Sequence, residues 1–221
     1  ELIEQTFNGT VASGGRVTST ISRNGDLVHR LYTNYNPSKL GAPANSDVNL
    51  YYPSFRMLKT VELEIGGQKI DKLYDHWLVT QHELFTLNPT NSFPLLNGGK
   101  FAVYDAATGG GNTEMRANYN KPTKEQQMAF HAFGAISSAP AETSAWVPLP
   151  FWFCRNVGLA LPLIALQYHE VKVIIELNKP GDNDFANGIS NCDLKLWAEY
   201  IYLDTDERRR FAQVSHEYLI E

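Results

Sequence analysis

The chain has 221 residues, of which 43% are hydrophobic, 12% aromatic and 19% charged, and its formal net charge is −5. A chain of this length can bury enough surface to fold without a metal ion or disulfide bonds. Its acidic balance does not suit a protein that coats nucleic acid, which needs a basic face. The two cysteines, Cys154 and Cys192, exclude a disulfide-rich scaffold and favour a reducing compartment such as the cytosol.

No segment is typical of membrane insertion or secretion. The longest apolar run, Val157–Leu166, contains Pro162 and is shorter than the roughly 18 residues that a membrane-spanning helix needs. The first residues lack the charged and then apolar pattern of a signal peptide. We therefore expect neither secretion nor membrane insertion.

The N-terminal part of the chain predicts strands. Residues 16–22 are rich in β-branched side chains with a period of two, since Val17, Ser19 and Ile21 alternate with Thr18 and Thr20, and this predicts a strand. Asn24-Gly25 is a tight-turn signal, and a second strand is expected over 26–32. Residues 34–49 are rich in Pro, Asn, Ser and Gly and predict a loop.

The clearest strand covers residues 61–65, where apolar and charged side chains alternate and should separate a buried face from a wet one. Gly66-Gly67 supplies the positive φ of a two-residue hairpin turn, and the chain returns over 68–74. Asp75 stands at an N-cap position. A short helix is expected over 76–85, with these residues at helical spacing: Trp77, Gln81, Leu84 and Phe85.

Residues 88–148 are the least regular part, with glycine runs and many Asn, Thr and Ala residues. Only 124–133 favours a helix. A loop of this length inside a domain is normally functional or disordered. We interpret about 88–145 as a surface insertion.

Strand character resumes at 146–153. Gly158 and Pro162 interrupt the apolar segment 151–171, and we expect a short helix over 159–168 with Pro162 in its first turn. Residues 171–177 predict a strand. Residues 194–203 predict a central strand that is apolar on both faces. About eight strands with long loops and no strand–helix alternation indicate an all-β fold, an antiparallel eight-stranded jelly-roll sandwich with short helices in long loops.

Catalytic, cofactor and metal patterns are not evident in the sequence. His169-Glu170 and His216-Glu217 lack the second histidine of a zinc-protease helix. Gly99-Lys100-Phe101 lacks the remaining residues of a phosphate-binding loop, and Asp182-Asn183-Asp184 lacks the other ligands of a calcium loop. We expect no enzyme activity, no cofactor and no metal.

Two further residues are of types that can carry covalent chemistry. Cys154 has no base placed beside it by the sequence and is interpreted as a buried structural thiol. Asn8 begins the one Asn-x-Ser/Thr sequon free of proline, and glycosylation there is not expected without a secretory route.

Five segments of distinctive composition run in order from near the N-terminus to the last residue: ISRNGDL (21–27), VELEIGGQKIDK (61–72), FWFCRNVGLALPLIALQYHEV (151–171), DTDERRRFAQ (204–213) and HEYLIE (216–221). Together they resemble the major capsid protein of the large nucleocytoplasmic DNA viruses. The resemblance covers the chain apart from the loops at roughly 34–52, 88–145 and 178–192.

The resemblance implies two jelly rolls in tandem, three copies in a nearly hexagonal trimer, and trimers that tile an icosahedral shell over an internal membrane. Residues 1–221 would be a single jelly roll, the first of the pair. We favour a fragment or the ordered part of a longer protein over the third alternative, a shorter relative that assembles differently. The expected partners are the chain itself, as homotrimer and lattice, and minor capsid proteins, without direct contact to nucleic acid. The expected place is the virion capsid, assembled in the host cytoplasm.

Residues 204–210 carry charges of both signs, which could fix the register between neighbouring subunits. The candidate interface residues are Asp204, Asp206, Glu207, Arg208, Arg209 and Arg210. An ordinary capped surface helix is the alternative interpretation of this segment.

Two other functions compete with a shell protein. A carbohydrate-binding jelly roll would use exposed aromatic platforms, for which the candidates are Tyr51, Tyr52, Trp77 and Trp146. A cupin-type enzyme would need several histidines on inward-facing strand positions, and the scattered histidines do not supply them.

Overall fold

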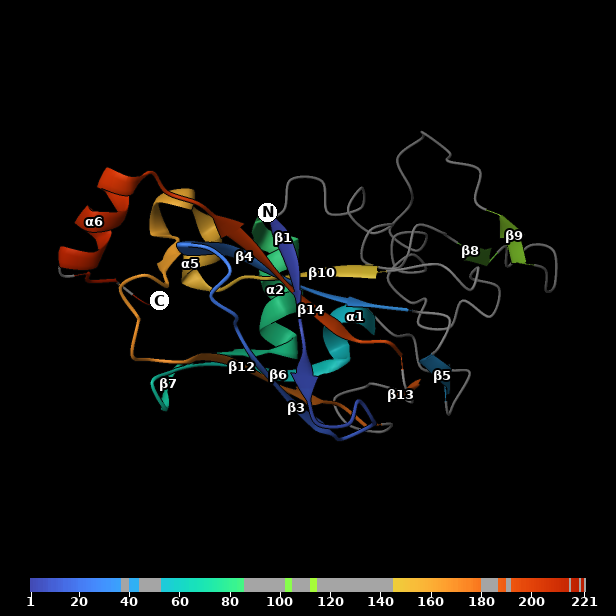
Figure 1. The fold of residues 1–221 in the computed structure, drawn as a ribbon. Helices are drawn as coiled ribbons and strands as arrows, with labels where there is room; N and C mark the ends of the chain where they lie inside the picture. Colours follow the sequence, from blue (N-terminus) through green and yellow to red (C-terminus); the bar gives the residue numbers. More distant parts are fainter. Residues whose placement is uncertain are drawn as a thin grey trace.

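Two antiparallel β-sheets lie face to face in the computed structural model of the protein (Figure 1). The structure describes residues 1–36, 40–43, 53–85, 102–104, 112–114, 145–179, 187–189, 192–214, 216–218 and 220. The hydrophobic core lies between the sheets and takes side chains from both of them. No helix among these residues is long and apolar enough to cross a membrane.

The first sheet has the strand order β1-β14-β4-β10, and β11 also pairs with β4. Its strands are β1 (Leu2–Gln5), β4 (Leu27–Tyr35), β10 (Ala145–Leu149), β11 (Leu161–Pro162) and β14 (Lys195–Ile201). The second sheet has the order β2-β3-β12-β6-β7. Its strands are β2 (Phe7–Asn8), β3 (Arg16–Thr20), β6 (Leu58–Ile65), β7 (Gln68–Tyr74) and β12 (Val171–Leu177). Two small pairs complete the described strands, β5 (Leu40–Pro43) with β13 (Asn187–Ile189) and β8 (Ala102–Tyr104) with β9 (Asn112–Glu114).

The chain alternates between the two sheets. It passes from β1 to β3, back to β4, across to the hairpin β6–β7, and then through β10, β12 and β14 in opposite sheets. This interleaving of two antiparallel sheets is the jelly-roll arrangement that the sequence predicted. The predicted count of eight strands is not confirmed, because each sheet holds five; eight remain only when the two-residue strands β2 and β11 are set aside.

Strand alternation decides which side chains enter the core. In β14, Leu196, Ala198 and Tyr200 are buried and alternate with half-buried residues. The predicted strand at 171–177 is confirmed with the same bounds, as β12. The central position of β14 is also confirmed, since it lies between β1 and β4, but its outer face is only partly covered.

The predicted hairpin forms at Gly66 and Gly67, whose φ angles of 60° and 83° are those of a two-residue turn that suits the strand twist. The predicted wet face of β6 is wrong at Glu62, which is only 8% exposed. Its Oε1 lies 2.9 Å from Lys69 Nζ and 3.0 Å from Lys72 Nζ. A carboxylate can be buried there because the β7 lysines cover it.

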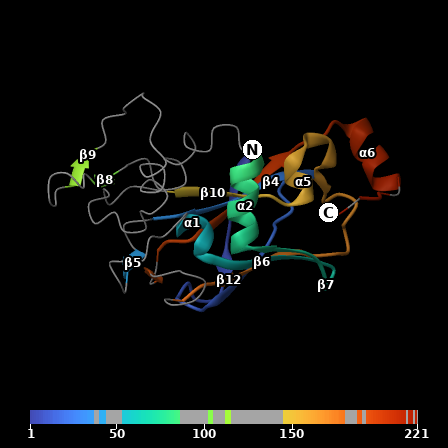
Figure 2. The ribbon, with the colours of Figure 1, turned by 180° about the vertical axis from the view of Figure 1, so that it is seen from behind.

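The predicted short helix is confirmed as α2 (Asp75–Phe85), which follows α1 (Pro53–Arg56) and the hairpin. The Asp75 carboxylate accepts a hydrogen bond from the His76 backbone N–H at 2.8 Å, which suits its N-terminal position. Leu78 and His82, four residues apart, form the buried face. The ring of His82 lies 5.4 Å from that of Phe55 in α1. Figure 2 shows α1 and α2 side by side in front of the sheets.

The tight-turn signal at Asn24-Gly25 lies between β3 and β4, which belong to different sheets, so it marks the crossing between them. Two local predictions are wrong. The strand predicted over 146–153 ends at Leu149 and is followed by the helix α5 (Trp152–Arg155). The helix predicted over 159–168 is replaced by the 3-10 turn η2 (Val157–Leu159) and by β11, where Pro162 pairs with Leu27. Tertiary pairing with β4 overrides the local preference there.

Some predictions lie outside the described residues. These are the helix at 124–133 and all of the 88–145 insertion except for β8, β9 and the first residue of β10.

Candidate subunit-interface surfaces

The charged segment 204–210 forms the start of the helix α6 (Thr205–Gln213), which stands beyond α5 at one end of the molecule (Figures 1 and 2). Asp204 is its N-cap, and its carboxylate accepts from the Thr205 N–H at 2.7 Å. Asp206 and Glu207 lie in the first turn, where negative charge suits the helix dipole. The capped surface helix is therefore present, and its role as an interface stays a prediction.

The arginines of α6 differ in their contacts. Arg208 Nε and Nη2 each lie 2.8 Å from the Oδ1 atom of Asp26, which is only 5% exposed. Arg209 and Arg210 are exposed and have no ion pair with another described residue. Nothing in the sequence marks Asp26 as the partner of Arg208, since 182 positions separate them.

The segment after α6 folds back toward the sandwich. The ring of His216 stacks on that of Phe211 at 5.4 Å, with 14° between the planes. The Tyr218 hydroxyl donates to the Ala160 carbonyl at 3.3 Å. Burial raises the pKa of Tyr218. The tail is therefore packed against the body beside η2.

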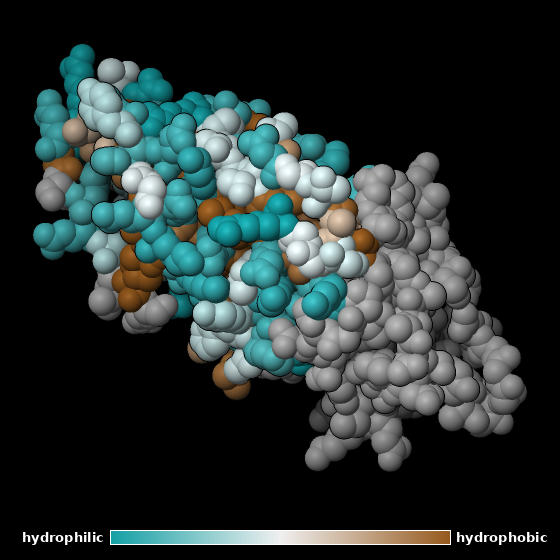
Figure 3. Space-filling view, turned by 90° about the horizontal axis from the view of Figure 1, so that it is seen from below, coloured by the Kyte–Doolittle hydropathy of each residue, from teal (hydrophilic) through white to brown (hydrophobic). Residues whose placement is uncertain are grey.

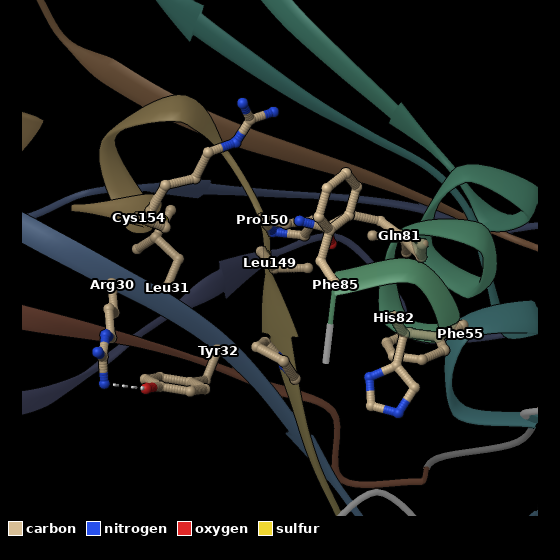
Figure 4. A pocket seen from close by; sticks show the side chains of 13 residues that line it. Arg30, Leu31, Tyr32, Phe55, Gln81, His82, Phe85, Leu149, Pro150 and Cys154 are labelled. Atoms are coloured by element: carbon tan, nitrogen blue, oxygen red, sulfur yellow. Dashed lines mark hydrogen bonds between the residues drawn. The ribbon is translucent and has the colours of Figure 1, made fainter. Parts of the chain in front are cut away.

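A second surface lies along α2. Trp77, Leu84 and Phe85 are 39%, 69% and 70% exposed, so the apolar residues at helical spacing mark the outer face of this helix. A cavity of about 550 Å³ lies beside it, between α2, β4, β10 and α5 (Figure 4). Its polar lining includes Arg30, which donates to the Tyr32 hydroxyl at 3.5 Å.

The aromatic residues considered as sugar platforms do not form one exposed strip among the described residues. Trp146 on β10 is half-buried, and its ring lies 6.4 Å from Tyr32 and 5.6 Å from Trp197. Trp77 lies on α2, a different element. Tyr51 and Tyr52 lie outside the described residues. Figure 3 shows a face on which hydrophilic side chains predominate and apolar ones appear in separate patches.

The described residues offer little chemistry. Within them no group of three His, Cys, Asp or Glu side chains is placed to hold a metal ion. Both cysteines are free; Cys192 is buried, whereas Cys154, which was predicted to be buried, is half-buried. Desolvation still raises the pKa of the Cys154 thiol to about 12, so this thiol stays protonated. Asn8 is exposed at the end of β2, and its glycosylation stays untested.

Comparison with known proteins identifies relatives over the whole chain. A family model described as "Major capsid protein N-terminus" matches residues 1–204. The major capsid protein of Pyramimonas orientalis virus is 43% identical over all of this chain, which covers 48% of that protein. The major capsid protein of Paramecium bursaria Chlorella virus 1 is 38% identical, again over the whole chain and over 44% of the relative. The chain thus spans about half the length of these curated relatives.

Solved structures agree with this relationship. The crystal structure of the PBCV-1 VP54 protein, fitted into a reconstruction of the virophage Sputnik, matches with a TM-score of 0.68 and 34% identity. The match covers all of this chain and 46% of that one. The Faustovirus major capsid protein shares the fold at 12% identity, with a TM-score of 0.58. The chain therefore belongs to the family of major capsid protein N-terminal domains.

Proposed function

We propose that this chain is the first jelly roll of a major capsid protein, a structural protein without enzyme activity. The observation that carries the proposal is the family match over residues 1–204, together with 43% identity to a viral major capsid protein. The interleaved sheets support it, because such sandwiches are a common shell-building architecture.

The proposed organisation is a tandem pair of jelly rolls. Residues 1–221 form one domain, with the surface insertion at about 88–145, and a second domain of similar size completes the protein. The lengths of the relatives support this organisation, because this chain covers 48%, 45% and 44% of three of them.

The proposed assembly is a homotrimer with a nearly hexagonal outline, whose copies tile an icosahedral shell. Heterologous contacts that close on themselves give a ring, and further contacts extend it into a lattice. Charges of both signs on α6 support a role in setting the register between neighbouring copies. A shifted alignment would place like charges opposite each other, which is unfavourable. In this assembly Asp204, Asp206, Glu207, Arg209 and Arg210 contact a neighbouring copy, whereas Arg208 is bound within its own chain.

The proposed partners are further copies of the protein and minor capsid proteins, in a virion capsid assembled in the host cytoplasm. The net charge of −5 supports a shell without direct contact to the genome. An internal viral membrane would lie close to the shell without being penetrated by this domain.

Negative-stain electron microscopy of the full-length protein tests this proposal. We expect trimeric particles with a nearly hexagonal outline. Particles that stay monomeric at high micromolar concentration would contradict a role as a shell protein.

A further inference from the structure

The helix α6 has no fully buried residue, so apolar packing alone does not explain how it is held on the sandwich. A nine-residue helix is too short to be stable by itself in water. Its N-cap at Asp204 satisfies one backbone N–H and fixes no orientation relative to the sheets. The tail after the helix holds its C-terminal end, through the contact of His216 with Phe211. A separate contact has to tie the N-terminal half of α6 to the body of the protein.

That contact is made by Asp26, whose position is fixed before α6 reaches it. Its backbone N–H donates to the Ile201 carbonyl at 3.1 Å, and its carbonyl accepts from the Ile164 N–H at 3.2 Å. The carboxylate Oδ2 accepts from the Leu203 N–H at 2.8 Å. Asp26 is thus bonded both to the end of β14 and to the turn after β11.

The remaining oxygen of this carboxylate, Oδ1, binds the side chain of Arg208 in α6. Both Arg208 Nε and Arg208 Nη2 lie 2.8 Å from Asp26 Oδ1, while the Arg208 side chain is still 53% exposed. One carboxylate therefore holds the last residues before α6 through Oδ2 and the second turn of α6 through Oδ1. Two bonds on opposite sides of the Asp204 cap restrict both the start and the direction of the helix.

We infer that Asp26 and Arg208 form a clamp that sets the orientation of α6, so that the arginine triplet divides into two roles. Arg208 is a positioning residue that acts inside the subunit. Arg209 and Arg210, with Asp206 and Glu207, are presented to a second copy of the protein by the helix that Arg208 holds. This division rests on the proposed capsid function, whereas the clamp itself depends only on contacts within the chain.

The charge pattern of α6 fits a second copy better than a strongly charged partner. Its first turn is acidic and its last turn carries Arg210, so negative and positive charges lie at different positions along the helix axis. A copy of the same helix or a similarly mixed surface can pair with both, provided that the helix points in a fixed direction. Without the clamp the orientation of α6 would no longer be fixed. The contact with the second copy would then weaken although the charged residues that make it are all still present.

Hydrogen exchange measured by mass spectrometry on the full-length protein tests the clamp. In the variant Arg208→Gln, we expect exchange of the α6 amides to accelerate about 10- to 100-fold, the effect of losing charge-assisted hydrogen bonds. Exchange in β12, in the core, should not change. The matched control is Glu217→Gln, which removes an exposed charge just after α6 that has no assigned contact with another described residue, and should leave α6 exchange at the wild-type rate.

A double-mutant comparison separates the clamp from a general loss of stability. If Asp26 and Arg208 act on α6 through one another, adding Arg208→Gln to Asp26→Asn should accelerate α6 exchange by much less than Arg208→Gln does alone. Unchanged α6 exchange in Arg208→Gln, or fully additive effects in the double variant, would overturn the clamp.

Self-association measured on the same variants tests the division of roles. Arg209→Gln should weaken trimer formation while leaving α6 exchange in the dissociated subunit unchanged. Arg208→Gln should weaken trimer formation and also accelerate α6 exchange in the dissociated subunit. Trimers of Arg209→Gln and Arg210→Gln as stable as the wild type would overturn that division. A wild-type protein that never self-associates would instead refute the proposed function, and the exchange result would still decide the clamp.

Discussion

Replacing Gly25 by alanine probes the segment that carries the chain from the second sheet to the first. A Cβ atom added at this position would lie 2.8 Å from the Tyr200 Cβ, 3.2 Å from its Cγ and 3.1 Å from its Cδ1. Tyr200 is only 1% exposed, and its hydroxyl donates to the Ser22 carbonyl. Its Cβ is anchored to the central strand β14, so neither partner can move away without a backbone shift.

The expected loss of stability follows from two opposing terms. Overpacking of this kind costs about 1–3 kcal/mol. Alanine also makes the unfolded chain less flexible, which returns about 0.4–1 kcal/mol where the backbone conformation allows it. We therefore expect Gly25→Ala to lower the free energy of unfolding by about 1–2 kcal/mol, which corresponds to a melting temperature lower by about 2–8 °C.

Urea denaturation followed by tryptophan fluorescence measures this difference. Gly158→Ala is the matched control, because its added Cβ would meet only the Asn156 side-chain oxygen at 3.5 Å, an ordinary contact on an exposed turn. The control should denature close to the wild-type midpoint. A Gly25→Ala protein with the wild-type midpoint would refute the close approach between the crossing segment and Tyr200.

Three further predictions concern stability and reactivity. Leu63 has no exposure, and Leu63→Asp should lower the free energy of unfolding by about 3–5 kcal/mol because it buries an unpaired charge. A soluble variant that unfolds at the wild-type urea concentration would show that Leu63 does not face the core. Burial raises the pKa of Glu62, but hydrogen bonds from Lys69 and Lys72 outweigh it, so its pKa is lowered from 4.5. The stability that these contacts supply is complete above pH 4.5 and is lost as the pH falls through the lower pKa of the folded state. The difference in unfolding free energy between the wild type and Glu62→Gln should therefore shrink in acid. A difference that does not depend on pH would contradict this. The buried Cys192 thiol and the half-buried Cys154 thiol, whose pKa is raised to about 12, should resist iodoacetamide at pH 8 until urea unfolds the protein; labelling of Cys154 at the rate of a free thiol would contradict its raised pKa.

Patterns that depend on neighbouring residues alone could be predicted from the sequence. The strand at 171–177 is rich in β-branched apolar residues, with Lys172 and Glu176 at its half-buried positions, and the turn at Gly66-Gly67 needs positive φ, so both are determined locally. The helix after Asp75 could be predicted from its cap. The resemblance to capsid proteins was also readable in the sequence, because its motifs are long and cover most of the chain.

Features that depend on distant partners could not be predicted. The spacing of Trp77, Leu84 and Phe85 indicated a helix, but its buried face is formed by Leu78 and His82, because α1 brings Phe55 against His82. Residues 161–162 pair with β4 rather than continuing a helix, and no local signal announces that pairing. The contact between Asp26 and Arg208 likewise exists only once β4 and α6 lie together.

Light scattering of the full-length protein after size-exclusion chromatography tests most directly whether this jelly roll belongs to a self-assembling shell protein. We expect a molar mass of three subunits. A stable monomer at high micromolar concentration would contradict it.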